Sequence, residues 1–116
     1  MFEVRHFSDI LVMGLEGDLN LRNVRQFDSI LGHALEEDVG RVVLDLSHLD
    51  HIDYKLVGHL IDRMIEIQCR GGEIKLAGGS HYVSNILRAM GCDEEVYSSV
   101  EDAVISFAPM TEEEWQ

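Results

Sequence analysis

A short apolar run, from Val42 to Leu46, lies between two longer segments whose apolar residues recur at helical spacing. All of its residues except Asp45 are apolar, which is typical of a strand covered on both faces in a parallel sheet. Parallel strands need a crossover connection, and the flanking segments are long enough to supply helical ones. This feature favours folds in which strands and helices alternate.

The rest of the chain continues this alternation. Turn residues and apolar patterns predict strands at Phe2 to Phe7, Ile10 to Glu16, Glu73 to Ala77 and Val96–Tyr97. Helical spacing predicts helices from Leu21 to Glu37, with Asn20 as the cap, from Lys55 to Arg70 and from Ser80 to Gly91. A last helix is predicted to begin after a cap at Ser98 or Ser99 and to end before Pro109. We therefore expect one α/β domain over residues 1–108 and an acidic tail at 109–116 that contains Trp115.

The charge balance excludes several classes of partner. The chain has 22 acidic and nine basic residues and a net charge of −13, without the clustered cations that bind nucleic acid or anionic membrane surfaces. Its longest apolar runs, of three or four residues, are far shorter than a membrane-spanning helix. The N-terminus has no leader pattern, and Cys69 and Cys92 lack CxxC spacing, so we expect a cytoplasmic protein with reduced thiols.

The junction after the apolar run is the first candidate site. A helix beginning at about Asp53 to Lys55 presents unpaired N–H groups and a partial positive charge, which favour an anion. Lys55, one of only two lysines in the chain, places a cation there instead. The lysine is either solvated at a small electrostatic cost, or paired with Asp53 or with a carboxylate of a partner.

Two other groups of residues have weaker functional interpretations. His48, His51 and His59, with Asp50 and Asp53, offer a poor zinc spacing, and we interpret the histidines as solvated. The loop Gly78-Gly79-Ser80 precedes a helix but lacks the ending of a nucleotide-binding loop, so we interpret it as a tight turn with a serine cap.

Acidic and amide side chains gather near one predicted sheet edge. They are Glu16, Asp18, Asn20 and Asp53, and no nucleophile or base is arranged with them. We expect caps and a binding surface here, not an enzyme, and no metal or other cofactor.

Three segments, in this order, resemble the STAS family of sulfate transporters and anti-sigma factor antagonists. LVMGLEGDLN (Leu11 to Asn20) is similar to the family's opening strand and turn, and RVVLDLSHLDHID (Arg41 to Asp53) to its central strand. GGEIKLAGGSHYVSNILRAMG (Gly71 to Gly91) is similar to the segment that follows. The resemblance spans nearly the whole chain and implies a small mixed, mostly parallel sheet with about four helices packed chiefly on one face.

The family motif at the helix start is Asp-Ser-Ser-Gly, whose second serine is phosphorylated in bacterial anti-sigma factor antagonists by a kinase that is also the anti-sigma factor. Asp53 matches the Asp, Tyr54 the first Ser, Lys55 the phosphorylated Ser and Leu56 the Gly. Asn20 replaces the final Asp of the family's opening turn. Because Lys55 has no hydroxyl, we expect the phosphorylation switch to be absent at this position.

The resemblance implies a non-catalytic module that binds a kinase-type anti-sigma factor and so frees a sigma factor. The expected contact residues are Asp18, Asn20, Asp53, Tyr54, Lys55, Leu56 and His59. The alternative is a scaffold subunit of a larger signalling or ABC-transporter assembly, and a homodimer is compatible with either interpretation.

Overall fold

A mixed five-stranded sheet forms the centre of the computed structural model, which describes residues 2–37 and 40–107. In chain order the elements are β1 (Phe2–Phe7), β2 (Ile10–Leu19), α1 (Val24–Glu36), β3 (Arg41–Ile52), the 3-10 turn η1 (Tyr54–Leu56), α2 (Val57–Cys69), β4 (Glu73–Ala77), α3 (His81–Ala89), β5 (Val96–Tyr97) and α4 (Val100–Ser106). The strands lie side by side in sequence order, with β1 antiparallel to β2 and the remaining neighbours parallel. The predicted α/β fold with a mostly parallel sheet is confirmed.

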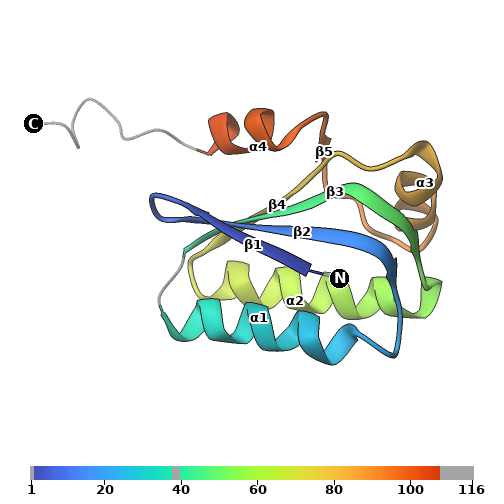
Figure 1. Cartoon of the computed structure of the whole chain (residues 1–116), viewed down its shortest axis with the longest axis horizontal. Coiled ribbons are helices and arrows are strands. Elements are labelled where there is room, and N and C mark those ends of the chain that lie inside the picture. Colours follow the sequence, from blue (N-terminus) through green and yellow to red (C-terminus); the bar gives the residue numbers. More distant parts are fainter. Residues whose placement is uncertain (1, 38–39, 108–116) are drawn as a thin grey trace, which may run out of the picture.

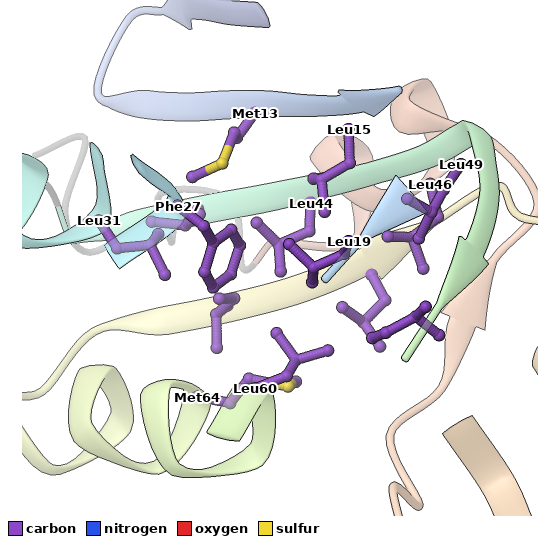
Figure 2. Close-up of a cluster of buried hydrophobic side chains, with 14 of the residues drawn as sticks. Met13, Leu15, Leu19, Phe27, Leu31, Leu44, Leu46, Leu49, Leu60 and Met64 are labelled. Carbon is purple, nitrogen blue, oxygen red and sulfur yellow. The ribbon is translucent and has the colours of Figure 1, made fainter. Parts of the chain in front are cut away.

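Helices cover both faces of the sheet unequally. Helices α1 and α2 lie side by side on one face, and α4 lies on the other (Figure 1). Buried side chains of β2, β3 and β4 pack with α1, α2 and α3 in the larger core, where Phe27 and Met13 are fully buried (Figure 2). A smaller core under α4 contains Val12, Val43 and Phe107. The helices thus pack chiefly on one face, as predicted.

The strands continue further along the sheet than the sequence pattern indicates. β3 was expected to end at Leu46 but runs to Ile52, because its second half pairs with β2. That pairing is irregular, with register shifts between Gly14 and Glu16 and between Gly17 and Asp18. The bulges interrupt the period-two pattern, so the second half of the strand is not visible as an alternation.

The helix starts also differ from the prediction in detail. Asn20 is not the cap of α1, which begins at Val24 after a turn closed by the N–H groups of Asn23 and Val24 on the Asn20 carbonyl. Ser80 and Ser99 do cap α3 and α4, accepting from the N–H groups of Val83 and Asp102 at 3.1 Å each. Pro109, Trp115 and the predicted tail boundary lie outside the described residues.

Candidate functional site

The β3–α2 junction is held in place by backbone groups. The Asp53 N–H donates to the Leu19 carbonyl of β2 at 2.9 Å, and the Asp53 carboxylate accepts from the Lys55 N–H at 3.0 Å. Asp53 is therefore a helix cap, as predicted. Leu56 is only 5% exposed and packs in the larger core, so the side chain of this predicted contact residue offers little surface to a partner.

Two neighbouring side chains remain on the surface of this junction. Tyr54 is 57% exposed, and Lys55 is exposed with its ammonium 6.0 Å from the centre of the Tyr54 ring. Within the described residues no carboxylate makes an ion pair with Lys55, and the Asp53 carboxylate accepts from its backbone N–H. The ammonium therefore lies near the positive end of the helix without an ion-pair partner on this part of the surface.

The loop after β2 lies directly beside the junction. In the register of β2 and β3, Asp18 lies opposite His51 and Leu19 lies opposite Ile52. Asp18 and Asn20 therefore lie at the same sheet edge as Asp53. The Asp18 carbonyl accepts from the Asn23 side chain at 2.6 Å, and the Asn20 side chain accepts from the Arg22 N–H at 2.9 Å. The predicted grouping of these residues at one edge is found in the structure.

His59 has a structural contact that the sequence did not indicate. Its Nε2 lies 2.6 Å from the Asp28 carboxylate of α1, and its side chain is about one-third exposed. The imidazole thus ties α2 to α1, so its availability to a partner is smaller than its helical position implied. His59 and Asp28 are 31 residues apart, and no local pattern indicates such a pair.

The sequence analysis did not identify Tyr82 and Leu21, an aromatic and an aliphatic residue at the same edge, as candidate site residues. Tyr82, in the first turn of α3, stacks on His51 with ring centres 5.6 Å apart, and its hydroxyl lies 2.7 Å from His51 Nδ1. Tyr82 and Tyr54 are more than half exposed, and Leu21 is 67% exposed. A sequence signal existed for Tyr82, since it lies two residues after the Ser80 cap and therefore near the carboxyl ends of the parallel strands.

The metal and phosphate-loop interpretations gain no support from the geometry. In residues 2–37 and 40–107, no three His, Cys, Asp or Glu side chains converge as a metal site requires. Gly78 and Gly79 have φ values of +72° and +92°, which are conformations that favour glycine, so the loop is the tight turn that was predicted.

The two cysteines are free thiols in different surroundings. Cys69 is exposed at the end of α2, and Cys92 is buried after α3. Burial raises the pKa of the Cys92 thiol above its ordinary value, so this thiol is a poor nucleophile at neutral pH. No helix in the described part of the chain is long and apolar enough to span a bilayer.

Sequence and structure comparisons define the class of protein. A family model, the STAS domain, matches residues 1–103, and the chain therefore belongs to the STAS domain family. The anti-sigma factor antagonist SpoIIAA in its unphosphorylated form superposes with a TM-score of 0.79 at 21% identity, over 90% of this chain and 93% of that one.

Two further structures share the fold. The Bacillus cell fate determinant SpoIIAA in its phosphorylated form has a TM-score of 0.73 at 19% identity, over 90% of this chain and 97% of that one. An anti-sigma factor antagonist from Mycobacterium paratuberculosis has a TM-score of 0.80 at 13% identity, over 90% of this chain and 91% of that one. At these identities the comparisons establish the fold, and that fold is the one found in anti-sigma factor antagonists.

Proposed function

We propose that this chain is a regulatory protein-binding module that engages a kinase-type anti-sigma factor, and that it does so without a phosphorylation switch at Lys55. The observation that carries the proposal is the exposed junction itself, where Tyr54 and Lys55 project from a rigidly bonded strand end. The chain belongs to the STAS family, and its fold is shared with SpoIIAA, which exists in both phosphorylated and unphosphorylated forms.

The exposed side chains at this edge are better suited to binding a protein than to catalysis on a small molecule. Tyrosine side chains supply large contact areas at low entropic cost, and Tyr54 and Tyr82 are both exposed here. The Lys55 ammonium, without an ion pair inside the described residues, suits a carboxylate of the partner. Asp18 and Asn20 extend the same surface along the β2 end. We propose that the module is non-catalytic and works in the cytoplasm of a bacterium, where its partner binds the sigma factor.

The test is a calorimetric titration of the purified chain with the purified kinase-type anti-sigma factor of the same organism. We expect binding, and we expect Lys55→Glu to weaken it by about tenfold or more, since the substitution replaces an attraction with a repulsion. Arg70→Glu makes the same charge change on an exposed residue at the far end of α2 and should leave the affinity unchanged. Equal losses in both variants would contradict a role for Lys55.

A separate measurement tests whether the phosphorylation switch is absent. After incubation with the same kinase and MgATP, the intact mass of the chain should be unchanged. A phosphoryl group mapped to Tyr54 would overturn this part of the proposal while leaving the binding itself intact. Co-purification with an ABC-type ATPase, without affinity for the anti-sigma factor, would instead support the scaffold function.

A further inference from the structure

Strand β1 presents an unpaired edge. It is the outermost strand of the sheet, with β2 on one side and no strand of the described residues on the other. The hairpin turn is two residues long, so Phe7 and Ile10 exchange both of their backbone hydrogen bonds. By alternation, the N–H and C=O groups of Phe2, Val4 and His6 point away from β2, toward the free edge.

The side chains of β1 divide into two sets. Phe2 packs against Phe27 of α1, with ring centres 6.1 Å apart, so the even-numbered residues face the α1 side. Glu3 and Arg5 lie on the opposite side, where their side chains approach to 3.4 Å and are about half exposed or more. The edge therefore carries one acidic and one basic residue, two positions apart, on a single face.

This spacing makes the strand complementary to itself. In an antiparallel pair of two β1 strands about a two-fold axis, the outward-pointing residues must oppose one another. A register with Val4 opposite Val4 sets Glu3 against Arg5 of the second copy, twice over. Shifting the register so that Glu3 opposes Glu3, or Arg5 opposes Arg5, places like charges together, which is destabilising. One register is thus favoured over its neighbours.

A partly apolar hollow lies beside the same edge. A cavity of about 270 Å³ lies between β1 and α1, and its lining includes the apolar Val4, Leu11, Ile30 and Ala34 and the polar His6, Ser29, His33 and Glu37. Val4 is 41% exposed there. Because the even-numbered side chains of an added strand would stand on the α1 side, Val4 of a second copy would cover this hollow and remove apolar surface from water.

We propose that two copies of this chain associate through β1, antiparallel and in the register centred on Val4, to form one continuous ten-stranded sheet. The occupant of the edge is a second copy because the charge order of the strand complements itself. This interface lies at the β1 edge of the sheet and leaves the β3–α2 junction exposed, so it does not depend on the proposed function.

The test uses charge reversal with analytical ultracentrifugation from about 1 μM to about 1 mM. The unmodified chain should dimerise reversibly within this range. Glu3→Arg and Arg5→Glu should each weaken self-association by about tenfold or more, because each creates two like-charge contacts across the axis. An effect of net charge alone predicts opposite results for the two variants, since the first reduces the chain's negative charge and the second increases it.

The decisive experiment mixes the two variants. The Glu3→Arg variant has two cations at positions 3 and 5 of β1, and the Arg5→Glu variant has two anions there. The mixture should therefore form heterodimers with an affinity close to that of the unmodified chain. The double variant Glu3→Arg/Arg5→Glu should also recover self-association. Asp62→Arg, a charge reversal on an exposed residue of α2, is the control and should dimerise like the unmodified chain.

A backbone variant tests the strand pairing itself. Val4→Pro removes the N–H that points to the free edge, without removing a hydrogen bond to β2, so the hairpin should persist while dimerisation falls by about tenfold or more. Circular dichroism of the variant reports whether the fold is retained. A chain that stays monomeric over the whole range, or a dimer that is indifferent to Val4→Pro and to the charge exchange, would overturn the proposal.

Discussion

Two of the strand-to-helix junctions at the carboxyl edge of the sheet, β3–α2 and β4–α3, differ in how the backbone turns from strand to helix. Between β3 and α2 the chain passes through an extended Asp53 and one 3-10 turn, and it exposes the side chains of Tyr54 and Lys55. Between β4 and α3 it passes through two left-handed glycines, Gly78 and Gly79, before the Ser80 cap.

This contrast shows where the fold has room for functional side chains. At Gly78 an added Cβ would lie 3.1 Å from the Ser47 backbone nitrogen, and closer still to its hydroxyl. The β4–α3 junction is therefore defined by close approach of the backbone to β3. At the β3–α2 junction the Asp53 side chain and the Leu19 carbonyl hold the backbone, so the side chains of Tyr54 and Lys55 can face a partner.

The largest expected effect is that of Gly78→Ala, which should lower the free energy of unfolding by more than about 2 kcal/mol. Left-handed strain and the contact with Ser47 both contribute. Gly17→Ala is the matched control, since Gly17 has a φ of +75° but an added Cβ there would meet nothing within 4 Å. Gly17→Ala should lower the free energy of unfolding by about 1 kcal/mol, which is the cost of the left-handed backbone conformation alone. Equal losses in urea denaturation would show that the close approach is unimportant.

Removal of the caps should have the next largest effect. Asp53→Ala should destabilise by about 1 kcal/mol, and Ser80→Ala by somewhat less, because only the carboxylate also interacts with the helix dipole. Asp53→Asn keeps an acceptor for the Lys55 N–H but removes the charge, so its loss should be intermediate. Added salt should reduce the difference in destabilisation between Asp53→Ala and Ser80→Ala, as measured by thermal unfolding. A difference that does not change with salt would contradict the contribution of the helix dipole.

Gly58→Ala should stabilise the chain, in contrast to Gly78→Ala. Gly58 is exposed in the first turn of α2, and an added methyl group would meet nothing within 4 Å. Helix propensity predicts a gain of about 0.5–1 kcal/mol. Gly32→Ala in α1, which has the same open surroundings, should gain as much. If Gly58→Ala alone weakens the anti-sigma factor titration, the partner approaches the backbone of α2 closely at this point.

The smallest expected effect on stability is that of Lys55→Glu, within about 0.5 kcal/mol. The better match of an anion to the helix N-terminus is offset by its repulsion from Asp53. Denaturation of this variant should therefore look like that of the unmodified chain, while its affinity for the anti-sigma factor falls. A large loss of stability would mean that Lys55 has a structural role, and the binding result would then need a second variant, Lys55→Gln.

The fold could be predicted from the sequence because its local signals agree with one another. The apolar run at Val42 to Leu46, the helical spacing of residues such as Phe27 and Leu31, and the Ser80 cap each depend on near neighbours. The Asp53 cap was predicted for the same reason. Where strand pairing is irregular, as in the second half of β3, the alternation of buried and exposed residues disappears, and the predicted strand was therefore too short.

Sequence alone was enough to establish the alternation of strands and helices, the STAS resemblance and the acidic charge, and it predicted that Lys55 occupies the family's phosphoserine position. Which side chains at that edge are available depended on the tertiary structure. It buried Leu56, tied His59 to Asp28 and brought Tyr82 onto His51. The physical reason is range: caps and periodicity act over a few residues, whereas these contacts join segments about 30 residues apart or depend on packing against the whole core.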